Sequence, residues 1–152
     1  MKNSYALITG ASSGIGLEIA KNLAERGYNL VLTARREDLL ESLANDITSK
    51  TDVKVDFISK DLSKKDAPKQ IFEFCESKNY QIDFLVNNAG YGIKTSFHET
   101  DIDVEEDFIR VLGTSVIMLT KLFLQKMLKN GTGKIMIVSS VASFAAPSAI
   151  QP

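Results

Sequence analysis

Short apolar runs alternate with stretches of helical periodicity along the chain. The runs predict strands at Tyr5–Thr9, Leu30–Leu32, Val53–Phe57, Ile82–Val86 and Lys134–Ser139. Short continuous apolar runs are typical of strands that are buried on both faces of a parallel sheet. The third run alternates apolar with charged residues, which predicts a strand that is less buried on one face.

Apolar residues recur with a helical period after each of the first four predicted strands. The first predicted helix ends at Gly27, and the longest runs from Val104 to about Lys129 with Gly113 inside it. Each crossover between parallel strands must pack back onto the sheet, so alternating strands and helices form an α/β fold. We therefore expect a Rossmann-like, doubly wound parallel sheet, truncated after the fifth strand.

The composition excludes several classes of protein. The 152 residues are 44% hydrophobic and 24% charged, and the formal net charge of -1 gives no electrostatic basis for binding nucleic acid or an anionic membrane. The N-terminus lacks the apolar segment of a signal peptide, and no apolar stretch approaches the roughly 20 residues that span a bilayer. Cys75 is the single cysteine, which fits a reducing compartment, and no spaced ligand cluster predicts a metal site. We expect a cytoplasmic location.

A glycine-rich loop, Thr9–Gly16 with the sequence TGASSGIG, joins the first predicted strand to the first helix. Its glycines allow a tight turn and a close approach of the backbone to a ligand. The helix that follows offers free N–H groups and a partial positive charge, which together favour a pyrophosphate, and Ser12 and Ser13 can add hydroxyl donors. A purely structural turn is the alternative, but the placement between strand and helix favours nucleotide binding.

The spacing G-x-x-x-G-x-G resembles the signature of the short-chain dehydrogenase/reductase family, and three further motifs follow in the family's order. Asp61-Leu62-Ser63 resembles the segment that carries the family's adenine-contacting Asp. Asn87–Gly90 resembles its NNAG motif, and Ser140, after the fifth predicted strand, matches its catalytic serine. Four motifs at strand ends are far more specific than any one of them.

The resemblance implies that residues 1–152 form a dinucleotide-binding domain that is C-terminally incomplete. It also implies an oxidoreductase that moves a hydride between a nicotinamide cofactor and a small-molecule carbonyl or alcohol substrate. Ser140 is the expected catalytic residue. The expected cofactor-binding residues are Gly10, Ser12, Ser13, Gly14, Ile15, Gly16, Arg35, Arg36, Asp61, Leu62, Asn88, Ala89 and Gly90.

The residues that follow the second predicted strand favour NADP(H) over NAD(H). Ala34 stands where the family's NAD users carry Asp, and Arg35 and Arg36 follow directly. A guanidinium can bind a 2′-phosphate through two parallel hydrogen bonds. The alternative is a solvated arginine pair that Glu37 and Asp38 compensate, which leaves NAD possible.

Two features depart from the family's catalytic pattern. The family's Tyr-x-x-x-Lys motif is expected just beyond Pro152, and no tyrosine lies downstream of Ser140, so we expect this chain to be inactive by itself. Arg110 stands where we align the family's relay Asn on the long helix, and arginine cannot accept a hydrogen bond. A non-catalytic dinucleotide-binding or interaction protein therefore remains the alternative function. We also expect a homo-oligomer, because this helix often forms the family's subunit interface.

Overall fold

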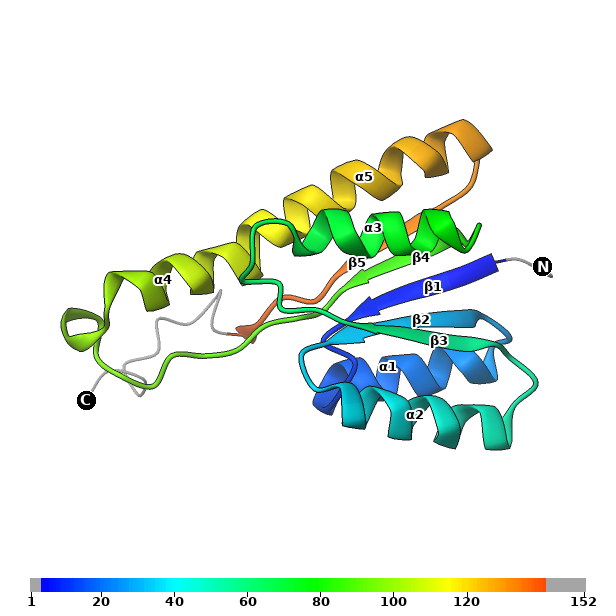
Figure 1. Cartoon of the computed structure of the whole chain (residues 1–152), viewed down its shortest axis with the longest axis horizontal. Coiled ribbons are helices and arrows are strands. Elements are labelled where there is room, and N and C mark those ends of the chain that lie inside the picture. Colours follow the sequence, from blue (N-terminus) through cyan, green and yellow to red (C-terminus); the bar gives the residue numbers. More distant parts are fainter. Residues whose placement is uncertain (1–3, 142–152) are drawn as a thin grey trace.

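The computed structural model describes residues 4–141, which contain a parallel sheet with strand order β3-β2-β1-β4-β5 (Figure 1). The strands are β1 Ser4–Thr9, β2 Asn29–Ala34, β3 Val55–Ser59, β4 Gln81–Asn87 and β5 Lys134–Ile137. The chain winds outward from β1 to β3 and then returns to place β4 on the other side of β1. This confirms the predicted Rossmann-like sheet, and β5 is the last strand within the described residues. Ligands of such sheets bind at the carboxyl ends of the strands where the order reverses, here between β1 and β4.

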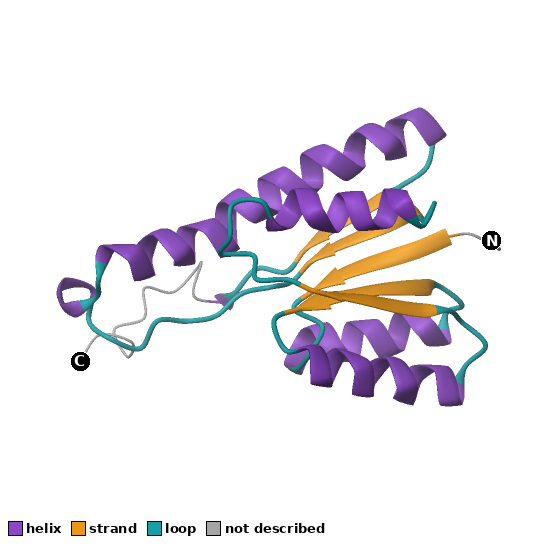
Figure 2. Ribbon diagram, in the orientation of Figure 1, coloured by secondary structure: helices purple, strands orange, loops and turns teal. Residues whose placement is uncertain are grey.

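Helices cover both faces of the sheet (Figure 2). One face carries α1 and α2, and the other carries α3 and α5, whereas α4 extends beyond the carboxyl ends of the strands (Figure 1). The helices are α1 Gly14–Glu25, α2 Glu37–Lys50, α3 Ala67–Ser77, α4 Ile102–Ile109 and α5 Ser115–Asn130. None of the helices within residues 4–141 combines the length and hydropathy needed to cross a membrane.

The central strand β1 shows why the apolar runs are continuous. Ala6 and Ile8 pack into the core beneath α1 and α2, whereas Tyr5 and Leu7 pack into the core beneath α3 and α5. All four side chains are at most 3% exposed, so both faces of the strand require apolar residues. By contrast, every residue of the edge strand β3 is only partly buried, on both faces and not on one face alone as the alternating sequence predicted.

The long helix departs from the prediction of one regular helix. The chain forms α4, then a π-helical turn at Arg110–Thr114, and then α5. Gly113 lies within this turn, and a Cβ atom added there would meet nothing within 4 Å. A π turn adds one residue to a helical turn, and such turns are frequent at functional sites. The hydrophobic period does not reveal it because the pattern on both sides remains helical.

Cys75 is part of the core. Its side chain is fully buried among the residues beneath α3 and α5. Burial is the main reason why the pKa of its thiol rises to about 12. The thiol is therefore protonated at neutral pH and behaves as a small apolar side chain.

Candidate functional site

A cavity of about 1050 Å³ lies at the carboxyl ends of the strands. Segments that follow each of the five strands contribute to its wall, together with the beginning of the long helical segment. All but one of the predicted site residues line it: Gly10, Ser12, Ser13, Gly14, Ile15, Arg35, Arg36, Asp61, Leu62, Asn88, Ala89, Gly90 and Ser140. Four motifs that are far apart in the sequence thus meet in one cavity.

Gly16 is the exception, because it packs inside the loop instead of lining the cavity. A Cβ atom at Gly16 would overlap the carbonyl oxygen of Gly10 and the side-chain Nδ2 of Asn88. Gly10 has φ +68°, and its own Cβ atom would lie 2.8 Å from the Cα of Ala89. These two glycines therefore let the first loop and the NNAG segment approach each other closely.

Thr9 ties the two loops together. The buried Thr9 hydroxyl accepts hydrogen bonds from the backbone N–H groups of Asn88, at 2.9 Å, and Ala89, at 3.0 Å. It donates to the carbonyl oxygen of Val86 at 3.3 Å. One hydroxyl thus pairs three backbone groups at the end of β4.

The Asn88 side chain completes this connection from the opposite side. Its Nδ2 donates to the carbonyl oxygens of Thr9, at 3.0 Å, and Gly10, at 3.3 Å. Sequence reasoning expected Asn88 to act near the ribose through its backbone and did not identify the side chain as a brace. Asn87, which precedes it, donates instead to the Thr120 hydroxyl on α5 at 3.2 Å.

The two predicted arginines have different surroundings. The Arg36 guanidinium donates to the Ser13 hydroxyl at 3.0 Å and to the Ser12 hydroxyl at 3.2 Å, which holds it against the glycine loop. Arg35 is exposed on the cavity wall, and its backbone oxygen accepts a hydrogen bond from the Ser59 hydroxyl at 3.0 Å. The Arg36 guanidinium therefore lies beside the glycine loop, whereas Arg35 lies on another part of the cavity wall.

The beginning of α1 points free backbone N–H groups at the loop. No acidic residue occupies the first turn of this helix, and the Ser13 side chain makes no capping hydrogen bond to it. The partial positive charge of the helix end is therefore left for a ligand. Gly14, with φ +58°, begins this helix, and a Cβ atom added there would meet nothing within 4 Å.

Several lining residues were not predicted from the sequence. Tyr91 follows the NNAG motif directly, and its ring meets Phe108 of α4 edge to face, with 5.5 Å between centroids. Partial burial and then the charge of Asp107 raise the pKa of Tyr91. Only the position of Tyr91 next to the motif could have signalled it. Asp107 and Phe108 reach the cavity because α4 packs there.

Arg110 is half-buried at the start of the π turn and does not line the cavity. The next two residues, Val111 and Leu112, line it. The Leu112 side chain lies so close to Gly90 that a Cβ atom there would be 2.8 Å from Leu112 Cδ2. This part of the cavity wall is therefore aliphatic, and the alignment of Arg110 with the family's relay Asn stays a prediction.

The segment after β5 brings Ser140 to the cavity. The Val138 backbone N–H donates to the Asn87 carbonyl oxygen at 2.9 Å, so the pairing of β5 with β4 continues past the last strand residue. The two residues that follow, Ser139 and Ser140, both line the cavity.

The family model for short chain dehydrogenases matches residues 4–151. The chain belongs to the short-chain dehydrogenase/reductase family. This membership accounts for the meeting of the glycine loop, the NNAG segment and Ser140 at one cavity, and it makes the chain part of an oxidoreductase family.

The chain is similar to reductases and dehydrogenases of different kinds. A very-long-chain 3-oxoacyl-CoA reductase from Vanderwaltozyma polyspora is 37% identical over 130 residues, which are 83% of this chain and 37% of the relative. A short-chain dehydrogenase from Sphingobium yanoikuyae, solved in complex with NADPH, is 31% identical with a TM-score of 0.88 over 95% of this chain and 56% of that one.

A third relative was solved with both a cofactor and a sugar. The L-sorbose reductase from Gluconobacter frateurii, in complex with NADPH and L-sorbose, is 29% identical with a TM-score of 0.89. The match covers 100% of this chain and 59% of that one. This chain thus spans between about a third and three fifths of these relatives' lengths.

Proposed function

We propose that this chain supplies the NADP(H)-binding part of an oxidoreductase that transfers a hydride between NADP(H) and a carbonyl or alcohol substrate. The observation that carries the proposal is the single cavity in which the glycine loop, Arg35, Arg36 and Ser140 meet. Family membership and solved relatives in complex with NADPH support it.

The residues present fit a dinucleotide. A cavity of about 1050 Å³ is at the upper end of the usual range for ligand sites. The α1 N-terminus and the hydroxyls of Ser12 and Ser13 suit the pyrophosphate, and Arg35 and Arg36 suit a 2′-phosphate. Ala34, the last residue of β2, brings no carboxylate that would repel this phosphate.

The other site residues would orient the ligand along the cavity. Asp61 and Leu62 would contact the adenine, and the Asn88–Gly90 backbone would contact the ribose next to the nicotinamide. When bound, NADP(H) would supply the hydride chemistry. Ser140 would hold the substrate's carbonyl oxygen through its hydroxyl, which fixes the carbon that reacts.

Titration of the chain with NADPH and NADH, followed by calorimetry or nicotinamide fluorescence, tests the cofactor proposal. We expect NADPH to bind more tightly, and Arg35→Asp to weaken NADPH by about tenfold because a charge-assisted hydrogen bond is replaced by repulsion. NADH should be nearly unaffected. Arg26→Asp makes the same charge change at the other end of α1 and should leave both affinities intact. Equal affinity of the unaltered chain for both nucleotides would contradict the NADP(H) preference.

The catalytic part of the proposal belongs to the whole protein, since this chain spans 37% to 59% of the relatives described above. Ketone reduction by the complete gene product with NADPH, and its loss in Ser140→Ala, would support an enzyme. A complete product that binds NADPH but reduces no aldehyde or ketone would favour the alternative, a non-catalytic dinucleotide-binding or interaction protein. We also propose a cytoplasmic location, with which the free thiol of Cys75 agrees.

We further propose that copies of the chain associate through the outer side of α4 and α5. Large apolar side chains recur there at intervals close to whole helical turns, and they are strongly exposed. They are Ile102 at 70%, Ile109 at 63%, Ile117 at 70% and Leu128 at 72% exposure.

Ile117→Glu should convert an oligomer into a monomer in size-exclusion chromatography with light scattering, because it places a charge in the apolar contact. Lys129→Glu, on the same helix, is the control and should leave the mass unchanged. A monomeric unaltered chain at micromolar concentration would refute the interface.

A further inference from the structure

A second, basic cavity adjoins the arginine end of the dinucleotide site. It has a volume of about 600 Å³ and shares Arg35, Lys60 and Asp61 with the larger cavity. The loop between β3 and α3 supplies half of the remaining lining residues, and β3 and α3 supply the others. Its charged lining consists of four cationic and two anionic side chains: Arg35, Lys60, Lys64, Lys65, Asp61 and Asp66. The excess of positive charge suits an anionic ligand.

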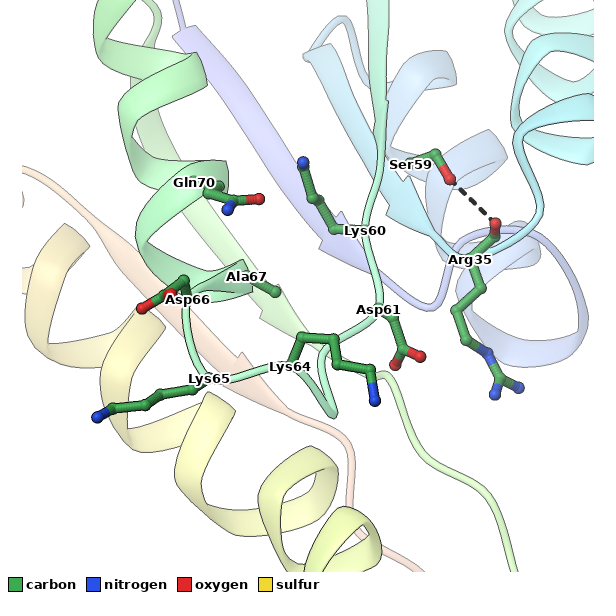
Figure 3. Close-up of a pocket in the computed structure, with 9 residues that line it drawn as sticks. All are labelled: Arg35, Ser59, Lys60, Asp61, Lys64, Lys65, Asp66, Ala67 and Gln70. Atoms are coloured by element: carbon green, nitrogen blue, oxygen red, sulfur yellow. Dashed lines mark hydrogen bonds between the residues drawn. The ribbon is translucent and has the colours of Figure 1, made fainter.

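Of the lysines of this cavity, Lys60 also lines the larger one, but Lys64 is the lysine whose ammonium group lies beside the Asp61 carboxylate (Figure 3). Figure 3 shows its ammonium group on the side where the Asp61 carboxylate and the Arg35 guanidinium lie, whereas the Lys65 side chain extends away from them. The Lys64 Nζ also comes within 4.0 Å of Asp107 Oδ2, and Asp107 lines the larger cavity from α4. The Lys64 ammonium therefore reaches the mouth of the dinucleotide site.

The contact between Lys64 and Asp107 is weak enough to give way to a ligand. Their side chains are 72% and 44% exposed, and the 4.0 Å separation is longer than a hydrogen bond. Exposed ion pairs of this kind contribute little stability because water and salt screen them. A phosphate dianion offers more charge and more acceptor oxygens than one carboxylate.

Arg36 is less free to move than Lys64. Its guanidinium already donates to the hydroxyls of Ser12 and Ser13, which fixes it beside the glycine loop. A phosphate bound beside the glycine loop would contact Arg36 on one side. Its other side, toward the β3–α3 loop, would remain accessible to further side chains. Arg35 and Lys64 lie on that open side.

We propose that Lys64 is a specificity-determining residue that recognises the 2′-phosphate of NADP(H) together with Arg35. This inference rests on the proposed function and adds to the site a residue from the β3–α3 loop. Lys64 exchanges its contact with Asp107 for the phosphate when the cofactor binds. The neighbouring lysine, Lys65, has no part in this recognition.

Calorimetric titration with 2′,5′-ADP and 5′-AMP tests the proposal, because these probes differ only in the 2′-phosphate. We expect Lys64→Gln to weaken 2′,5′-ADP binding by about fivefold and to leave 5′-AMP binding unchanged. Lys65→Gln removes the same charge one residue away and should change neither affinity by more than about twofold. Asp107→Asn should strengthen 2′,5′-ADP binding, because it removes the competing partner of Lys64. Lys64 is exposed, so thermal unfolding of Lys64→Gln should match that of the unaltered chain.

Two results would contradict the role of Lys64 and leave the proposed NADP(H) preference intact. One is an equal loss in Lys64→Gln and Lys65→Gln, which would indicate a general charge effect. The other is an unchanged preference for 2′,5′-ADP in Lys64→Gln. If the unaltered chain bound the two probes with equal affinity, both the proposed NADP(H) preference and the proposed role of Lys64 would be wrong.

Discussion

Replacing Thr9 with valine is expected to lower the free energy of unfolding by about 3 kcal/mol, although the two side chains have almost the same shape. Valine removes the hydroxyl that accepts from the backbone N–H groups of Asn88 and Ala89 and donates to the Val86 carbonyl. An unpaired buried backbone donor costs about 1–3 kcal/mol, and here two donors lose their partner together. Urea denaturation followed by circular dichroism measures the change.

Thr33→Val is the matched control for this prediction. Thr33 is as deeply buried as Thr9, at 1% exposure, and it occupies the adjacent strand in register with Thr9. Within the described residues, however, its hydroxyl has no hydrogen-bond partner. Removing it should leave stability unchanged or slightly raised, because an unsatisfied buried polar group is lost. Equal destabilisation by both variants would contradict the proposed contribution of the Thr9 hydrogen bonds to stability.

The sequence predicted the strands well because burial on both faces imposes an unambiguous pattern. In β1, Tyr5 and Leu7 serve one core and Ala6 and Ile8 serve the other, so no polar residue is tolerated between Tyr5 and Ile8. The long helix was predicted less well. Its π turn at Arg110–Thr114 keeps an outwardly helical pattern, and the extra residue rotates the positions around it. Arg110, at the start of this turn, lies outside the cavity, whereas Val111 and Leu112 line it.

Site residues were predictable where a motif ends a strand and unpredictable where a tertiary contact brings them in. Gly10, Asp61 and Asn88 follow three strands of one parallel sheet, so topology alone directs them to the same edge. Lys64 and Asp107 belong to a loop and a helix that meet only after α4 has packed. Neither residue lies in a sequence motif that distinguishes it from an ordinary charged residue on the surface.

Gly16→Ala should cause the largest loss of NADPH affinity among these substitutions, even though alanine is the better helix former. Gly16 lies in the first turn of α1, where its replacement by alanine would ordinarily gain up to about 1 kcal/mol. Here the added methyl group would overlap the Gly10 carbonyl oxygen and Asn88 Nδ2. Neither neighbour can easily move away, because Asn88 Nδ2 is hydrogen-bonded to the carbonyls of Thr9 and Gly10.

The cost of overpacking must therefore exceed the gain in helix propensity, and we expect a net loss of about 2–3 kcal/mol in the free energy of unfolding. Displacing the glycine loop also moves the α1 N-terminus away from the pyrophosphate position, so NADPH affinity should fall by more than about a hundredfold. Gly113→Ala is the control, since a Cβ atom there meets nothing within 4 Å and Gly113 does not line the cavity. It should retain full affinity. A Gly16→Ala chain that binds NADPH normally would mean that the loop and the NNAG segment need not approach each other this closely.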